Sequence, residues 1–354
     1  MFERLNPRMP EPPPYSVNYY QVNAGTGDCE IVLLLNNKVP SKQTIEKAVL
    51  IDGGEPTAYY LMNIRKTFDS IKQAFSLKTL KFDAVIITHW DEDHYRGILE
   101  LMSQDWDKAS ARVPWLKYNE NTNHPDSILY IPYRFPPSRG NFTYVEGKET
   151  PPNLYLCLGN DKMCKVISDS ENGSPTSLPK PQQFDINSSD LIGRELFNDF
   201  YNEDSLKQNK ANSPAGLVGI YSELKGRPGL FCVAANYQYL SGGSSENKDK
   251  DSSSANKDTP ADSSLTNKSS IVCLVIWPEN NQVTHYLAGD APLALEEAVV
   301  QWIGRDLVEG QVKVVKVSNQ GARTSLPWTL FQNLKPFYIL CSAGKAHEQP
   351  SKLI

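Results

Sequence analysis

The segment that decides the fold of this chain runs from Ile87 to Gly97 and reads Ile-Thr-His-Trp-Asp-Glu-Asp-His-Tyr-Arg-Gly. Apolar and β-branched residues lead into it over Ala84–Thr88, and such a run predicts a short buried strand. Imidazole and carboxylate groups together suit zinc, manganese or iron. The sequence therefore predicts a metal site at the end of a strand, built from four side chains within six residues: His89, Asp91, Asp93 and His94.

The local geometry of this cluster follows from the strand that precedes it. Alternation along an extended or turning segment puts His89, Asp91 and Asp93 on one side, and His94 reaches round as a helix begins. The helix itself is predicted over Tyr95–Met102. The alternative is a solvated acidic turn with two incidental histidines, because loops are polar by default. The density of metal-binding side chains favours the metal site.

The same residues carry a family resemblance. The stretch His89-Trp90-Asp91-Glu92-Asp93-His94 resembles the metal motif of the metallo-β-lactamase superfamily, His-x-His-x-Asp-His, with Asp91 in place of the middle histidine. This variant is similar to the branch that contains the hydrolase-like domain of the bacterial DNA-uptake (competence) channel protein. The stretches Gln21–Val32 and Val49–Gly54 extend the resemblance to the opening strands.

The resemblance implies a fold and an activity. The fold is α/β (α+β), a four-layer αβ/βα metallo-β-lactamase sandwich with two facing mixed sheets and helices outside. The activity is a metal-dependent hydrolase that acts on phosphodiesters. His89 and Asp91 would hold one metal ion, and Asp93 and His94 the other. Asp290 would bridge the two ions, and Asp93 would also orient the attacking hydroxide. Zinc is the expected cofactor, as one or two divalent ions, with manganese as the alternative.

Asp290 has a second interpretation. Gly289-Asp290 lies between a predicted strand, Val283–Ala288, and a predicted helix, Ala291–Trp302. A lone aspartate at such a place is usually a helix cap. In the resembled family, however, a Gly-Asp between strand and helix supplies the bridging carboxylate, so the ligand is the favoured interpretation.

Two further aspartates stand in glycine turns, Asp28 after Gly27 and Asp52 before Gly53. Each could orient the metal ligands by accepting their hydrogen bonds, or could simply favour a turn. For Asp28 both interpretations stay open, and for Asp52 we favour the turn.

The resemblance breaks in the last section of the chain. Asn319-Gln320-Gly321 stands where the branch has His-His-Gly, and Gln349 lies near the position of a further histidine. Amides are far poorer zinc ligands than imidazole. This favours a second hypothesis, a catalytically degenerate protein of the same fold with a binding or regulatory role. His124 is interpreted as a loop residue and His285 as a partly exposed strand residue.

Composition limits the partners and the setting. The net charge of 36 − 41 = −5 argues against a broad nucleic-acid surface, so a small-molecule or phosphodiester substrate is expected instead. No apolar run reaches the length of a membrane span, and the first residues lack a signal core. Six scattered cysteines are typical of a reduced, cytoplasmic protein. No sequence feature fixes the oligomeric state.

The domain organisation follows from composition along the chain. Residues 1–14 are rich in proline and predict a flexible lead-in, and residues 15–354 predict one metallo-β-lactamase-like domain. Two inserts interrupt this domain. A lid-like insert is expected at about 103–215, and a disordered one at Ser241–Ser264, where Ser, Asn, Asp and Lys dominate.

Overall fold

The structure is a computed structural model. It describes residues 13–39, 43–105, 107, 109–110, 112–118, 120, 126–132, 181–184, 226–235, 238–239, 265–277, 282–306, 312–322, 325 and 327–342. The predicted lead-in up to residue 12, most of the insert at 103–215 and the whole of Ser241–Ser264 lie outside these residues.

The first half of the chain forms a six-stranded mixed sheet with the order β1-β2-β3-β4-β5-β6. The first three strands pair antiparallel and form a meander, and β3 to β6 pair in parallel. The strands are β1 (Tyr15–Gln21), β2 (Glu30–Asn36), β3 (Thr44–Ile51), β4 (Ala84–Ile86), β5 (Ile128–Pro132) and β6 (Pro181–Phe184).

The second half repeats this plan with a second six-stranded sheet, of order β12-β11-β10-β9-β7-β8. Here β10, β11 and β12 are parallel, and the remaining pairs are antiparallel. The strands are β7 (Gly229–Ala235), β8 (Gln238–Tyr239), β9 (Val272–Trp277), β10 (Gln282–Leu287), β11 (Val314–Lys316) and β12 (Tyr338–Leu340).

Two helices were predicted from the sequence. One of them, α6 (Leu293–Asp306), lies close to the predicted Ala291–Trp302. The other, α2, begins at Glu92 and not at Tyr95, so that Asp93 and His94 lie in its first turn. Acidic residues in a first turn are stabilised by the helix dipole, which the sequence prediction did not take into account. The helices are α1 (Ala58–Ala74), α2 (Glu92–Gln104), α5 (Leu265–Lys268), α6 (Leu293–Asp306), α7 (Trp328–Leu334) and the 3-10 turn η2 (Ser318–Gly321).

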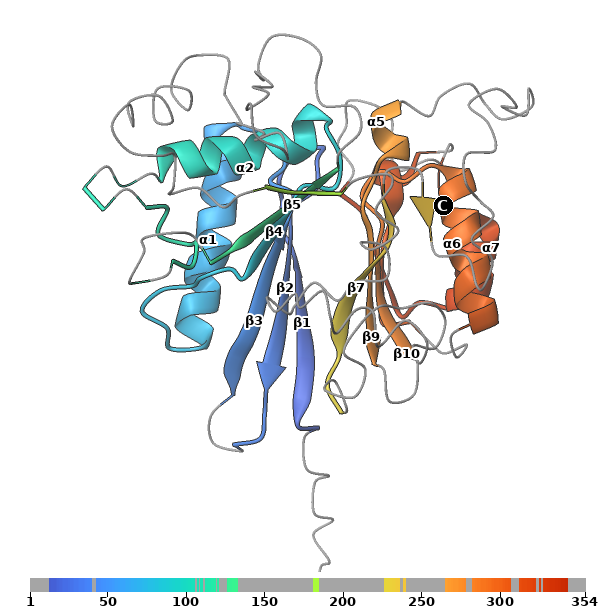
Figure 1. Cartoon of the computed structure of the whole chain (residues 1–354), viewed down its shortest axis with the longest axis horizontal. Helices are drawn as coiled ribbons and strands as arrows, with labels where there is room; N and C mark the ends of the chain where they lie inside the picture. The colour runs from blue at the N-terminus through green and yellow to red at the C-terminus, as the bar shows by residue number, and fades with distance from the viewer. Residues whose placement is uncertain are drawn as a thin grey trace, which may run out of the picture.

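Three separate apolar cores show that these elements form four layers. One core joins the first sheet to α1 and α2, and another joins the second sheet to α6 and α7. The third lies between the sheets and contains residues of both, such as Val32 and Val275. Figure 1 shows the two sheets side by side, with α1 and α2 outside one and α6 and α7 outside the other. The predicted four-layer sandwich with two mixed sheets is confirmed.

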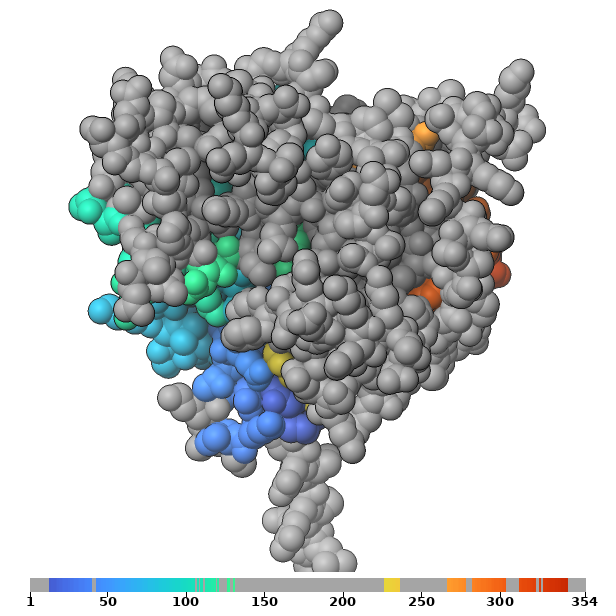
Figure 2. Space-filling model, in the orientation of Figure 1, coloured from blue at the N-terminus to red at the C-terminus, as the bar shows by residue number. Residues whose placement is uncertain are grey.

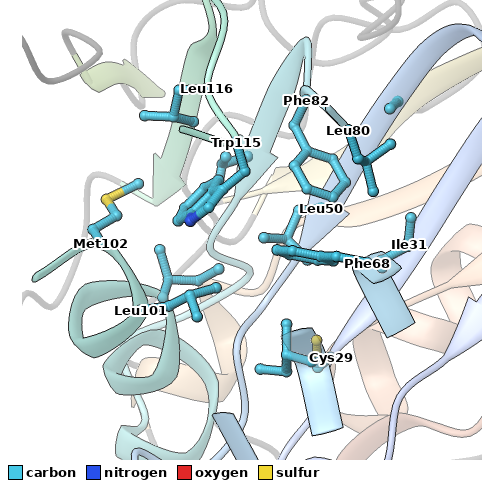
Figure 3. Packing of buried hydrophobic residues seen from close by; sticks show 14 of the residues in the cluster. Cys29, Ile31, Leu50, Phe68, Leu80, Phe82, Leu101, Met102, Trp115 and Leu116 are labelled. Carbon is cyan, nitrogen blue, oxygen red and sulfur yellow. The ribbon is translucent and has the colours of Figure 1, made fainter. Parts of the chain in front are cut away.

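The core under α1 and α2 also takes in part of the predicted lid. Trp115 packs against Phe82 and Phe68, with ring centroids 6.2 Å and 6.3 Å apart (Figure 3). Leu116 is fully buried beside them, and β5 extends the first sheet. The described residues 112–118 and 126–132 are therefore part of the body of the domain. The lid role of the rest of 103–215 lies outside the described residues.

The halves also meet at the surface. In Figure 2 the yellow residues of the β7 segment border the blue residues of the N-terminal strands. Among the described residues, no helix is both long enough and apolar enough to cross a membrane.

Candidate metal centre between the two sheets

The centre forms where the carboxyl ends of β4 and β10 approach each other. The ring of His89 lies 4.0 Å from that of His94, measured between centroids. Asp290, from the end of β10, reaches both histidines. Its Oδ1 lies 3.5 Å from His94 Nε2, and its Oδ2 lies 3.8 Å from His89 Nε2. The three residues are buried, and one ligand atom of each lies within 4.8 Å of the others.

Asp290 does not begin the helix that follows it. Helix α6 starts at Leu293, and the carboxylate of Asp290 contacts His89, His94 and the side-chain amide of Gln320. Burial alone would raise the pKa of Asp290, but the nearby histidines and Lys316 outweigh it and lower this pKa. The carboxylate is therefore ionised and directed at the histidines, as a metal ligand would be. Its role as a bridging ligand stays a prediction.

His94 is held by Asp52. Its Nδ1 lies 2.9 Å from Asp52 Oδ2, which leaves Nε2 directed at Asp290. A carboxylate on one ring nitrogen fixes the proton there and frees the other nitrogen to bind a metal. Burial would lower the pKa of His94, but Asp290, Asp52 and Asp93 raise it well above its ordinary value. The acidic surroundings thus attract a positive charge to this ring, either a proton or a metal ion.

The turn interpretation of Asp52 was incomplete. Its backbone has a φ of 53°, as a turn residue has. Its side chain, however, is fully buried and holds the ring of His94 in place. Besides His94, it accepts hydrogen bonds from Thr88 N at 2.8 Å and Thr88 Oγ1 at 2.6 Å. The sequence showed only that Asp52 directly follows an apolar run, and the parallel pairing of that strand with β4 comes from the structure. Asp52 therefore orients the segment that contains His89 and His94.

Asp91 and Asp93 lie at the open side of the centre. Asp91 Oδ2 is 3.5 Å from His89 Nε2, and Asp93 Oδ1 is 4.0 Å from His94 Nε2. Their side chains are 37% and 30% exposed, whereas the histidines are fully buried. All five predicted residues thus converge, three of them inside and two facing the entrance. Their assignment to separate ions stays a prediction.

Asp28, for which the sequence left both the turn and the orienting role open, forms an ion pair with Lys316. No sequence pattern had singled out Lys316. Lys316 is fully buried, and its Nζ makes an ion pair with Asp28 Oδ2 and lies 3.4 Å from the carbonyl oxygen of Gly289. Burial would lower the pKa of Lys316, but Asp28, Glu30 and Asp290 raise it. Asp28 Oδ2 is also 3.9 Å from His94 Nδ1. The pair therefore joins the first sheet to the second, directly beneath the centre.

The glycine turn around Asp28 is needed for close approach. A Cβ on Gly27 would lie 1.6 Å from the carbonyl oxygen of Asp93, so any side chain there would displace the first turn of α2. In the same way, a Cβ on Gly97 would lie 1.8 Å from the carbonyl oxygen of Gly53. The two turns thus press directly against α2, where Asp93 and His94 lie.

Gln320 stands where the resembled branch has a histidine. Its Nε2 lies 3.1 Å from Asp290 Oδ2 and 3.4 Å from His94 Nε2, and the residue is buried. Asn319 donates its backbone N–H to Gly289 O at 3.2 Å. Both have a positive φ, 45° for Asn319 and 46° for Gln320, which is strained backbone of the kind found at functional sites.

The other histidine predictions have different outcomes. His285 is buried at 4% exposure, so the expectation of a partly exposed residue was wrong. It packs against Tyr19, with ring centroids 6.0 Å apart, because β10 faces the other sheet. His124 and Gln349 lie outside the described residues.

The donor set fits a divalent ion. His89 Nε2 is buried, and no group in the described part of the chain hydrogen-bonds it, although two carboxylates lie within 3.8 Å. An orphaned imidazole nitrogen beside carboxylates is costly unless a cation joins them. His89, His94 and Asp290, with Asp91 at the entrance, would hold that ion.

Comparison with known families agrees with this class of site. A model of the metallo-beta-lactamase superfamily matches residues 44–153, which contain the whole His89–His94 motif. The match ends before the second sheet, so Asp290, Lys316 and Gln320 are joined to the centre by the structure alone. Among curated proteins, no match to the chain was found. A match to this superfamily together with a His/Asp cluster of this kind points to a metal-dependent hydrolase.

Proposed function

We propose that the chain is a metal-dependent hydrolase that acts on phosphodiesters. The observation that carries the proposal is the position of Asp290, which lies within 3.8 Å of two histidine nitrogens from the first half of the chain. A bound divalent ion would act as a Lewis acid and lower the pKa of a water molecule. Zinc is the ion we expect, as one equivalent or two, with manganese as the alternative.

The residues of the chain would have distinct roles. His89, His94 and Asp290 would hold the ion inside, and Asp91 would complete its ligands from the entrance. Asp93 is partly exposed and close to His94, so it is suited to orient a water molecule against the substrate. The buried carboxylate of Asp52 would keep His94 in the right orientation.

The substrate class rests on the resemblance of the motif to the competence-channel branch. A small phosphodiester is favoured over a long nucleic acid, because the net charge of −5 gives no general attraction for a polyanion.

A second candidate function is favoured by Gln320. An amide takes the place of an imidazole between Asp290 and His94, and amides bind zinc poorly. The chain would then be a catalytically degenerate member of the fold, with a binding or regulatory role.

One experiment separates the two functions. The purified full chain is analysed for metal content, then assayed with bis-p-nitrophenyl phosphate in the presence of Zn²⁺ or Mn²⁺. The hydrolase predicts bound metal and turnover, with turnover lost in Asp93→Asn and metal lost in Asp290→Asn. Asp69→Asn, at an exposed carboxylate on α1, is the matched control and should behave as the wild type. Metal without turnover would support the degenerate protein, and absence of metal would overturn the metal centre.

A further inference from the structure

Thr266 contacts the centre from the opposite half of the molecule. It lies in α5, the short helix just before β9, and its Oγ1 donates a hydrogen bond to Asp91 Oδ1 at 2.6 Å. The two residues are 175 positions apart in the chain. Figure 1 shows α5 at the same end of the molecule as α2.

The two carboxylate oxygens of Asp91 have different neighbours, Thr266 and His89. Oδ1 accepts from Thr266, and Oδ2 lies 3.5 Å from the orphaned His89 Nε2. The hydroxyl has one hydrogen, and Asn267 Oδ1 is a more distant acceptor at 3.4 Å. The hydrogen therefore belongs to Asp91, which leaves Oδ2 for a cation beside His89.

Asp91 has a competing partner in its own helix. It is the N-cap residue of α2, with φ −86° and ψ 142°, the backbone conformation from which aspartate usually accepts a bond from the first turn. Yet within the described structure its side chain makes no such capping bond. The carboxylate of Asp91 is directed at His89 and Thr266 instead, so Thr266 stabilises the orientation that the helix alone would not favour.

Thr266 is held in place independently of Asp91. Its carbonyl oxygen accepts from Ser269 N at 2.9 Å and from Ser269 Oγ at 2.6 Å. The next residues connect to the centre, because Ile271 N donates to the carbonyl oxygen of Thr88 at 2.9 Å. Helix α5 is thus anchored beside the strand end that contains His89, and it presents a fixed hydroxyl to Asp91.

We propose that Thr266 is a positioning residue that keeps Asp91 as a metal ligand and away from the cap of α2. The proposal rests on the proposed metal-dependent function. It predicts an unusual pair of effects for Thr266→Val, which has nearly the same shape but no hydroxyl. Metal affinity should fall, because Asp91 can turn towards the first turn of α2. The stability of the metal-free protein should not fall, because the capping bond replaces the lost one.

The test compares Zn²⁺ affinity, measured by competition with a chromophoric chelator, and the thermal midpoint of the metal-free full chain. Thr266→Val should bind Zn²⁺ about tenfold more weakly, which is the lower end of the effect of residues that orient metal ligands. Thr266→Ser should restore the affinity. Thr67→Val, which removes a hydroxyl that donates to Asn63 O on α1, is the matched control and should leave it unchanged.

Two further variants show whether Thr266 acts through Asp91. Asp91→Ala should weaken Zn²⁺ binding, and adding Thr266→Val to it should cause no additional loss. The absorption spectrum of the Co²⁺-loaded protein should change in Thr266→Val but not in Thr266→Ser.

Three results would overturn the inference. The first is a Thr266→Val protein that binds Zn²⁺ as tightly as the wild type. The second is a loss of affinity that adds to that of Asp91→Ala. The third is a lower thermal midpoint of the metal-free variant, because Thr266 would then be structural. A wild type that binds no metal would instead contradict the proposed function itself.

Discussion

The two halves of the molecule share one plan but contribute to the centre in opposite ways. The first half supplies four of the five predicted ligands from a stretch of six residues at one strand–helix junction, His89 to His94. The second half supplies single side chains from four separate places: Thr266 on α5, Asp290 after β10, Lys316 on β11 and Gln320 in η2. The first half thus provides most of the predicted ligands from one short segment, and the second half adds Asp290 and scattered side chains that contact them.

The ion pairs within the first sheet and between the two halves also differ in how deeply they are buried. In the first sheet, Asp83 has two lysine partners, and one of them, Lys47, retains 17% exposure of its side chain. At the junction of the sheets, Lys316 pairs with Asp28, and both side chains are fully buried. A buried pair contributes little net stability, but breaking it leaves an uncompensated charge inside.

The largest effect is therefore expected for Lys316→Met. Removal of the ammonium leaves Asp28 buried and unbalanced, so the free energy of unfolding should fall by about 3–5 kcal/mol. Urea denaturation followed by circular dichroism measures it. Lys47→Met is the matched control, because Asp83 keeps Lys117 as a partner, and it should cost less than about 1 kcal/mol. Equal losses for the two variants would mean that the junction of the halves is no more sensitive than the first sheet.

A second comparison concerns one histidine from each half of the molecule, His94 in α2 and His285 in β10. Carboxylates raise the pKa of His94, whereas burial, assisted by Lys313, lowers the pKa of His285 to about 4. In the unfolded chain His285 has a pKa near 6.5. Between these values the unfolded state binds the proton and the folded state does not. The stability due to neutral His285 is thus complete above pH 6.5 and is lost as the pH falls towards 4.

His285→Gln should remove that dependence while keeping a polar group beside Thr284, the hydrogen-bond partner of His285 Nδ1. From pH 7 to pH 4 the wild type should lose about 3 kcal/mol more than the variant, at 1.36 kcal/mol for each pKa unit. Urea denaturation at a series of pH values measures the difference. Parallel stability curves for the two proteins would show that folding does not lower the pKa of His285.

The comparison of the halves also explains what the sequence could predict. The motif His89–His94 could be found in the sequence because its four ligands lie within six residues. Asp290 could be found because the order of strand, Gly-Asp and helix is also local. The two sheets were predicted from the family resemblance, and the strand before His89 from a short apolar run, which is also a local signal. In contrast, Lys316 is one lysine within the run Val314-Val315-Lys316-Val317, and its partner Asp28 is 288 residues away. No pattern along the chain contains that pairing.

Asp52 and the start of α2 show a second limit. Asp52 was taken as a turn former because aspartate before two glycines usually is one. The structure uses it for the turn and for His94 at once, and only the parallel register of β3 with β4 reveals the second use. The helix start was placed three residues late because the metal motif was treated as extended, although its acidic residues suit a first turn.

The smallest effect expected here concerns Gln320, a position where the second half departs from the resembled branch. Gln320→His would put an imidazole nitrogen where an amide now lies 3.1 Å from Asp290 and 3.4 Å from His94. The backbone should accept the change, because histidine tolerates the positive φ of 46° at this position better than most residues.

With that imidazole, a second divalent ion should find a nitrogen ligand beside Asp290 and His94, with Asp93 at the entrance. We expect the affinity for a second Zn²⁺ equivalent to rise about tenfold, which is about 1.4 kcal/mol. Isothermal titration calorimetry of the metal-free full chain resolves the two equivalents. Gln320→Leu is the control, since it removes the amide without offering a ligand, and it should bind the second ion no better than the wild type. If Gln320→His also fails to improve on the wild type, the amide side chain of Gln320 is not the reason why a second ion binds weakly. The cause would then be the strained Asn319–Gln320 turn, which would hold any side chain away from the ion.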